Sequence, residues 1–121
     1  MISAELAGFI QSLRSLWAIE LLLLLHRRPE QAWRIDDLVV ELRSSRALID
    51  GVLSRLHELG LVERQPDGTY RYRTAAPALE DLVGELDRLH AERPLAIAQA
   101  IHGAPDEKLR AFSDAFKLKK D

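Results

Sequence analysis

The chain has 121 residues, of which 47% are hydrophobic and 30% are charged, and it contains no cysteine. This length and composition are typical of one compact soluble domain, and the lack of cysteine excludes disulfide scaffolds, thiolate zinc sites and thiol catalysis. The formal net charge is −2, whereas proteins that bind nucleic acid through their overall charge are normally basic. Any DNA binding must therefore come from local clusters of charge.

Apolar residues spaced three and four apart predict one long helix from Ser3 to Arg27, ending before Pro29. Its second half is apolar on nearly every side, which predicts a central position or an oligomer interface. Glu20 interrupts this run, which is shorter than the roughly 20 apolar residues that cross a bilayer. Charged residues follow the run, whereas a secretory signal places them before it. We therefore expect a buried helix, no membrane partner and a cytoplasmic protein.

Two short elements come next. Residues 32–35 fit a single edge strand, and Asp36 is placed to cap a helix that continues to Leu42. Residues 43–45, Arg-Ser-Ser, predict a tight turn in which one of the two serines caps a further helix. Gly60 then predicts the end of that helix, because glycine readily adopts the left-handed conformation found there.

A hairpin is predicted over residues 61–73, where apolar or aromatic residues alternate with polar ones on both sides of Pro-Asp-Gly. The tripeptide favours a type I turn with its glycine in the left-handed conformation. The period of two places Tyr70 and Tyr72 on one face and Thr69, Arg71 and Arg73 on the other.

The last third of the chain is predicted to be helical. Pro77 sits in the first turn of one helix, and Pro94 separates it from a short helix that ends at Gly103. Asp106 caps a last helix, whose apolar face either docks on the body of the protein or is captured by a partner protein. That face consists of Leu109, Phe112 and Phe116.

This order of elements resembles the winged helix-turn-helix core of the MarR-like and PadR-like bacterial transcriptional regulators. The likeness covers residues 16–92 and is closest in IDDLVVELRSSRALIDGVLSRLHELGLVERQPDGTYRY, in which Leu53–Val62 precedes the Asp-Gly of the hairpin tip. It implies a mainly α fold with a small β-hairpin, a winged helix-turn-helix with extra N- and C-terminal helices. Residues 1–92 would form that domain with its flanking helices, and residues 93–121 a C-terminal helical appendage.

The resemblance implies that the helix from Ser45 to Leu59 is the recognition helix and that the hairpin is a wing. Its helical period separates a buried stripe from an open face. The stripe contains Leu48, Ile49, Val52, Leu53, Leu56 and Leu59. The open face carries Arg46, Ala47, Asp50, Gly51, Ser54, His57 and Glu58. Phosphates repel Asp50, although a carboxylate can accept a hydrogen bond from a cytosine amino group.

Residues 43–73 contain six arginines and four acidic residues, a local charge of +2 in a chain of −2 overall. The resemblance and this charge predict DNA contacts from the turn, the helix and the wing. The predicted residues are Arg43, Ser44, Ser45, Arg46, Ala47, Asp50, Ser54, Arg64, Thr69, Arg71 and Arg73. A serine can instead act only as a cap, and strand arginines can be merely solvated. The alternative function is a winged helix that binds protein, as a regulatory adaptor, which the acidic Asp50 and Glu58 favour.

In the related regulators, flanking helices form a dimer interface. Two leucine-rich stripes of this chain suit that role, because a small domain has limited means to bury them. The predicted interface residues are Leu6, Phe9, Leu13, Leu79, Leu82, Val83, Leu86 and Leu89. The alternative is that both stripes pack within one monomer.

No motif predicts catalysis. His26, His57, His90 and His102 lie on separate elements, and none has a partner four residues away that could complete a metal pair. The sequence has neither a phosphate-binding loop nor a nucleophile motif in a strand–turn–helix context. We therefore expect a protein that is not an enzyme and that has no metal and no cofactor.

Overall fold

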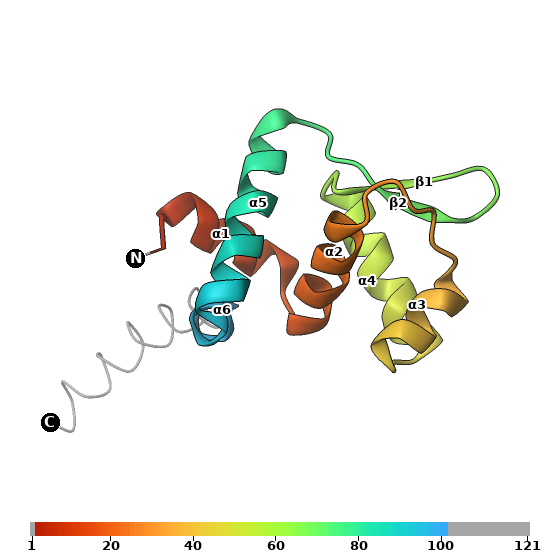
Figure 1. The fold of residues 1–121 in the computed structure, drawn as a ribbon, viewed down its shortest axis with the longest axis horizontal. Coiled ribbons are helices and arrows are strands. Elements are labelled where there is room, and N and C mark those ends of the chain that lie inside the picture. Colours follow the sequence, from red (N-terminus) through yellow and green to blue (C-terminus); the bar gives the residue numbers. More distant parts are fainter. Residues whose placement is uncertain (1, 102–121) are drawn as a thin grey trace, which may run out of the picture.

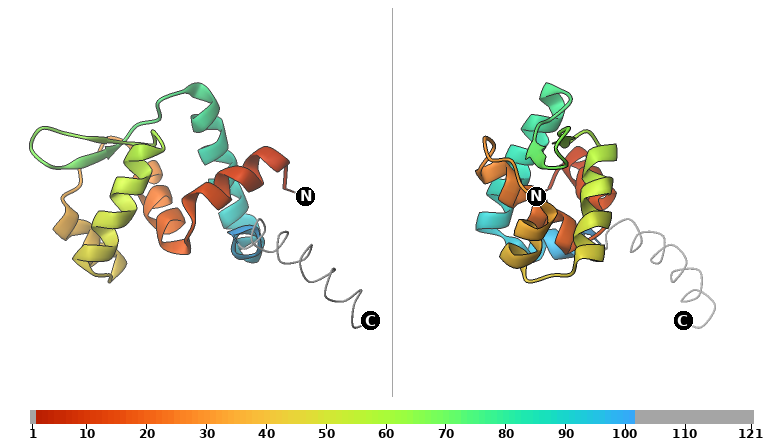
Figure 2. Two further views of the ribbon diagram at one scale, coloured as in Figure 1. Left: turned by 180° about the vertical axis from the view of Figure 1, so that it is seen from behind. Right: turned by 90° about the vertical axis from the view of Figure 1, so that its right-hand side faces the viewer.

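The computed structural model describes residues 2–101, which are mainly helical with one small antiparallel sheet, as predicted (Figure 1). The elements are α1 (Ala4–Leu13), α2 (Leu16–Arg27), α3 (Ile35–Leu42), α4 (Arg46–Glu58), β1 (Val62–Arg64), β2 (Tyr70–Tyr72), α5 (Pro77–Glu92) and α6 (Pro94–Ile101). α2 lies centrally, with α3, α4 and the hairpin towards one end of the molecule and α1, α5 and α6 towards the other (Figures 1 and 2). The predicted last helix and its apolar face lie outside the described residues.

The single long helix predicted for the N-terminal region is wrong, because the chain turns by 104° between α1 and α2. Arg14 adopts a left-handed conformation with φ of 73°, and the Ser15 hydroxyl accepts a hydrogen bond from the Ala18 N–H at 3.1 Å to cap α2. The apolar spacing continues across this corner and therefore hides it. Among the described residues no single helix is long and apolar enough to cross a bilayer, although α1 and α2 together have that composition.

The core is built around α2, whose residues Ile19, Leu21, Leu22 and Leu25 have no solvent exposure. Both leucine-rich stripes predicted to form a dimer interface pack into this core within one chain. Leu6, Phe9, Leu13, Val83 and Leu86 are buried, and Leu79, Leu82 and Leu89 are partly buried against them. For the five buried residues the structure corrects the predicted interface, because α1 and α5 pack them into the core of their own chain.

The short helix α6 belongs to the same folded unit. It packs against α1 and α5, and Ile97 is fully buried in the common core. The first residues of the predicted C-terminal appendage, 93–101, thus complete the domain, and the remainder of the appendage lies beyond the described residues.

The hairpin has the predicted form, with Val62 paired to Tyr72 and Arg64 paired to Tyr70. The edge strand predicted at residues 32–35 is reduced to one residue, Trp33. Its N–H donates to the Tyr70 carbonyl at 2.7 Å, and the Tyr70 N–H donates back at 2.8 Å. β2 is therefore flanked by β1 on one side and by Trp33 on the other.

The start of α3 differs from the prediction by two residues. Its N-cap is Arg34 and not Asp36. The Asp37 carboxylate accepts a hydrogen bond from the Arg34 N–H at 3.3 Å, which is the back-reaching half of a capping box. Asp36 is left free to contact another element.

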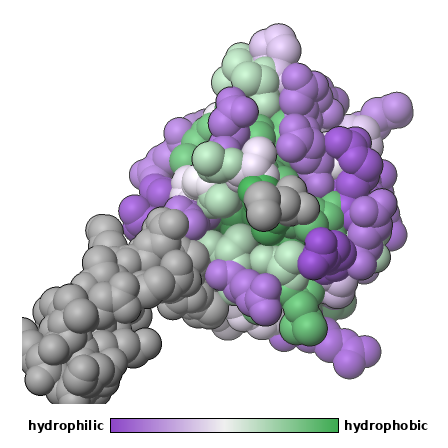
Figure 3. All heavy atoms as spheres, turned by 90° about the vertical axis from the view of Figure 1, so that its left-hand side faces the viewer, coloured by the Kyte–Doolittle hydropathy of each residue, from purple (hydrophilic) through white to green (hydrophobic). Residues whose placement is uncertain are grey.

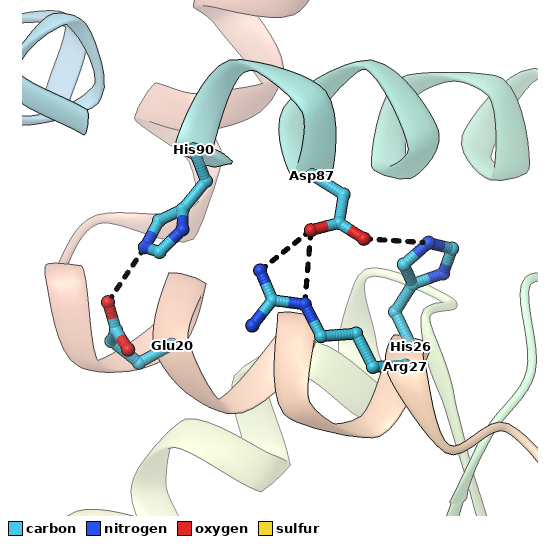
Figure 4. A network of polar contacts seen from close by, with 5 residues as sticks. All are labelled: Glu20, His26, Arg27, Asp87 and His90. Carbon is cyan, nitrogen blue, oxygen red and sulfur yellow. Dashed lines mark hydrogen bonds and ion pairs between the residues drawn. The ribbon is translucent and has the colours of Figure 1, made fainter. Parts of the chain in front are cut away.

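Polar contacts fasten α5 to α2 (Figure 4). Asp87 accepts hydrogen bonds from Arg27 Nη2 at 2.8 Å and Nε at 3.2 Å, and His26 Nε2 lies 3.5 Å from its second oxygen. One turn further on, His90 Nε2 lies 3.0 Å from Glu20. These contacts hold α5 along the length of α2.

The hairpin is joined to α5 by Tyr72, whose hydroxyl donates to Glu80 Oε1 at 2.7 Å. Burial raises the pKa of this hydroxyl, and the Glu80 carboxylate raises it further, so Tyr72 stays protonated as the donor. The Tyr72 ring also meets the His26 ring edge-on, with 5.1 Å between centroids. The inner face of the hairpin is therefore fixed to the body at Tyr72.

Two glycines at α4 should respond to alanine in opposite directions. Gly51 lies within the helix, where an added Cβ meets nothing within 4 Å, so Gly51→Ala should stabilise the protein by about 1 kcal/mol through helix propensity. Gly60 has φ of 78°, and a Cβ there would lie 3.0 Å from the Ala75 Cβ. Gly60→Ala should destabilise by about 1–2 kcal/mol. Urea denaturation measures both, and shifts of the same sign would contradict this placement of the helix end.

Candidate nucleic-acid interface

The open face of α4 is the first part of the candidate interface. The Ser45 hydroxyl accepts a hydrogen bond from the Leu48 N–H at 3.1 Å, which fixes the start of the helix. Ile49, Val52, Leu53 and Leu56 bury the opposite face. The exposed residues are Arg46, Ala47, Asp50, Gly51, Ser54, His57 and Glu58, as predicted. Thirteen residues give this helix a length of about 20 Å, enough to lie in a DNA groove or along another helix.

Arg46, the first residue of α4, is held by an acidic residue of α3. Its Nη1 donates to Asp36 Oδ1, and both side chains are largely exposed, at 66% and 65%. Asp50, four residues along α4 and also exposed, makes no ion pair with any described residue. The guanidinium is thus directed towards α3.

The outer face of the hairpin is the second part. Arg71 lies opposite Glu63, and Arg73 Nη1 lies 3.7 Å from the same carboxylate. The antiparallel pairing of Trp33 with Tyr70 places Arg34 beside Thr69, on the face of Arg71. Arg64, which was grouped with Arg71 and Arg73 in the prediction, pairs with Tyr70 and so lies on the other face, exposed at the end of β1.

The tip of the hairpin is closed by its own hydrogen bonds. The Thr69 hydroxyl lies 2.7 Å from Asp67 Oδ1 and 3.0 Å from Gln65 Oε1, and the Thr69 N–H donates to Asp67 at 3.0 Å. Hydrogen bonds from the Thr69 hydroxyl and then from its N–H lower the pKa of the Asp67 carboxyl. Thr69, predicted as a DNA contact, therefore shapes a tip that carries a charged carboxylate.

The turn between α3 and α4 holds three of the residues that were predicted to contact DNA. Arg43 ends α3 in a left-handed conformation, with φ of 53° and an exposed side chain. Ser45 is occupied as the cap of α4, although it remains exposed. The Ser44 hydroxyl is buried and has no hydrogen-bond partner among the described residues. The Ser44 hydroxyl oxygen is inaccessible in this conformation, and its contact with a phosphate stays a prediction.

A shallow hollow of about 250 Å³ joins the two parts of the interface. It lies between the end of α4 and the outer side of β1, and its walls include His57, Glu63 and Arg73. The remaining lining residues are Gly60, Val62 and Ala75. The open face of α4 is therefore continuous with the outer face of the hairpin.

Three residues of this surface were missed from the sequence: Arg34, Asp36 and Glu63. Arg34 reaches the hairpin only through the Trp33–Tyr70 pair, which joins distant segments. Asp36 was read as a cap, and its contact with Arg46 depends on how α3 packs against α4. Glu63 lies opposite Arg71, and alternation along the first strand together with the hairpin pairing could have indicated its ion pair with Arg73.

The chain matches no protein-family model, and comparisons with curated proteins and with solved structures gave no match.

Proposed function

We propose that this chain is a winged helix-turn-helix protein that binds double-stranded DNA, with α4 in the major groove and the hairpin as the wing. The order α2, Trp33, α3, α4, β1, β2 supports this assignment, because it provides three helices followed by a wing with a residual third strand. The observation that carries the proposal is the continuity between the open face of α4 and the arginine-bearing hairpin.

The arginines around α4 and on both faces of the hairpin separate into two sets. Arg34, Arg43, Arg64 and Arg71 make no ion pair with any residue in the 2–101 range. Arg46 and Arg73 are instead each paired with a carboxylate. The unpaired set is suited to phosphates, since such contacts release counterions without requiring an ion pair to break. Arg43 lies just before the N-terminus of α4, and the other three lie on or beside the hairpin.

We further propose that the protein acts as a homodimeric transcriptional regulator in the bacterial cytoplasm. The buried leucine stripes leave a different surface for a second copy. Figure 3 shows apolar side chains gathered on the face of the molecule at the end formed by α1, α5 and α6. Leu95, on α6, is 75% exposed. This end lies away from α3 and the hairpin, so contact there leaves both proposed DNA-binding surfaces free.

The second candidate function is a protein-binding adaptor without DNA binding. It is favoured by the carboxylates on the same surface, since Asp36 and Glu63 neutralise two arginines and Asp50 stands unpaired on α4. The exposed Val40 of α3, at 77%, adds an apolar contact of the kind that protein partners use.

The wing is tested by Arg64→Ala and Arg71→Ala in salt titrations on duplex DNA. If each arginine neutralises one phosphate, each variant should weaken binding to all sequences about equally and lower the slope of log affinity against log salt by about 0.9. Arg93→Ala, which removes the same charge from the exposed end of α5, is the matched control and should leave the slope unchanged. Equal slopes for all four proteins would remove the hairpin from the DNA contact.

A further inference from the structure

The ion pair between Arg46 and Asp36 is not explained by a contribution to the stability of the fold. Both side chains are about two-thirds exposed, so the pair is solvated and contributes little to folding. It lies where the recognition helix would first meet a base edge, because Arg46 opens α4 and Ala47 and Asp50 are exposed beside it. A residue that adds negative charge there works against general DNA affinity.

We propose that Asp36 is a specificity-determining residue, which positions Arg46 to read a guanine and keeps it away from phosphates. This inference rests on the proposed DNA-binding function. An unrestrained arginine at a helix N-terminus can contact the nearest phosphate of any sequence. Asp36 accepts from one Nη1 donor and leaves the other guanidinium donors available. A bidentate contact with guanine O6 and N7 needs only two donors in a fixed plane.

The choice of partner supports a positioning role. Asp50 lies four residues after Arg46 on the same exposed face, at a spacing that allows an ion pair along a helix. The structure pairs Arg46 with Asp36 instead, across the α3–α4 contact. The guanidinium is therefore anchored to a second helix, and its direction is set by the packing of α3 on α4.

The neighbouring acid Asp37 gives a matched control. It occupies the same first turn of α3 and is also exposed, but its carboxylate accepts from the Arg34 N–H at 3.3 Å. Asn at position 37 keeps an oxygen acceptor for this bond. Asp36→Asn and Asp37→Asn thus change the net charge equally, and only the first removes the ionic partner of Arg46.

The experiment selects bound sequences from a pool of duplexes with a randomised centre, using wild type, Asp36→Asn, Asp37→Asn and Arg46→Ala. Wild type should enrich sites containing a guanine at one fixed position by roughly tenfold, the size expected of a good bidentate contact. Asp36→Asn and Arg46→Ala should both lose this enrichment, and Asp37→Asn should keep it. Asp36→Asn should also bind the unselected pool more tightly than Asp37→Asn does, with a salt slope steeper by about 0.9.

The possible results distinguish failure of the proposed DNA binding from failure of the role proposed for Asp36. No binding of any duplex by wild type would overturn the proposed function. Binding by wild type without a base preference, or with a preference that Asp36→Asn retains, would overturn this inference and leave the proposed function standing. A preference lost equally in Asp36→Asn and Asp37→Asn would also overturn it, because the effect would then follow net charge and not the contact with Arg46.

Discussion

Replacing Leu86 by glutamate is expected to unfold the protein and not to release a folded monomer from a dimer. Leu86 has no solvent exposure and lies on the inner face of α5. Truncation of such a leucine to alanine costs about 2–5 kcal/mol, and glutamate adds the cost of burying a carboxylate without a partner. A loss of this size is comparable with the whole stability of a small domain. Urea denaturation and circular dichroism measure it.

Leu95→Glu is the matched control, because it makes the same change on the exposed side of α6. Its effect on the free energy of unfolding should lie within about 0.5 kcal/mol. If the exposed α1–α5–α6 end holds a second copy, Leu95→Glu should lower the molar mass measured by light scattering while the chain stays folded. A Leu86→Glu variant that is folded, stable and monomeric would contradict the core described here and would restore the leucine stripe as an interface.

Asp50→Lys is expected to bind DNA more tightly and less selectively than wild type. Asp50 is exposed near the centre of the open face of α4, where the substitution removes one repulsion and adds one attraction for phosphates. The dependence on salt should steepen accordingly, and the free energy of unfolding should change by no more than about 0.5 kcal/mol. Anisotropy titrations on mixed genomic duplexes at two salt concentrations measure both affinity and slope.

The same variant also tests the adaptor alternative. If Asp50 faces a donor or cation of a protein partner, Asp50→Lys should abolish capture of that partner while binding to duplexes stays negligible. Weaker DNA binding by Asp50→Lys than by a tightly binding wild type would contradict the present account of Asp50, since it would make this carboxylate a base reader.

Much of α4 and of the hairpin could be predicted because both are set by local physics. Ser45 caps α4, its apolar period matches the buried face, and Gly60 ends it in a left-handed conformation. The alternation around the hairpin turn gave the correct faces for Tyr70 and Arg71. These features depend on residues only a few positions apart.

The errors arose where distant segments decide the structure. The corner at Arg14 lies within an unbroken apolar period, so only the packing of α1 across α2 shows that the helix is interrupted. A leucine stripe has the same sequence pattern whether it packs against its own chain or against a second copy. Only the folded structure shows that Leu86 is buried within its own chain. The contact between Asp36 and Arg46 likewise follows from the packing of α3 against α4.

The most direct test of the central claim is the binding of wild-type protein to a labelled duplex pool as salt concentration is varied. If Arg34, Arg43, Arg64 and Arg71 each neutralise one phosphate, log affinity should fall against log salt with a slope of roughly −3 to −4 per chain. A slope near zero, or no binding at the lowest salt concentration, would contradict DNA binding and would favour the protein-binding alternative.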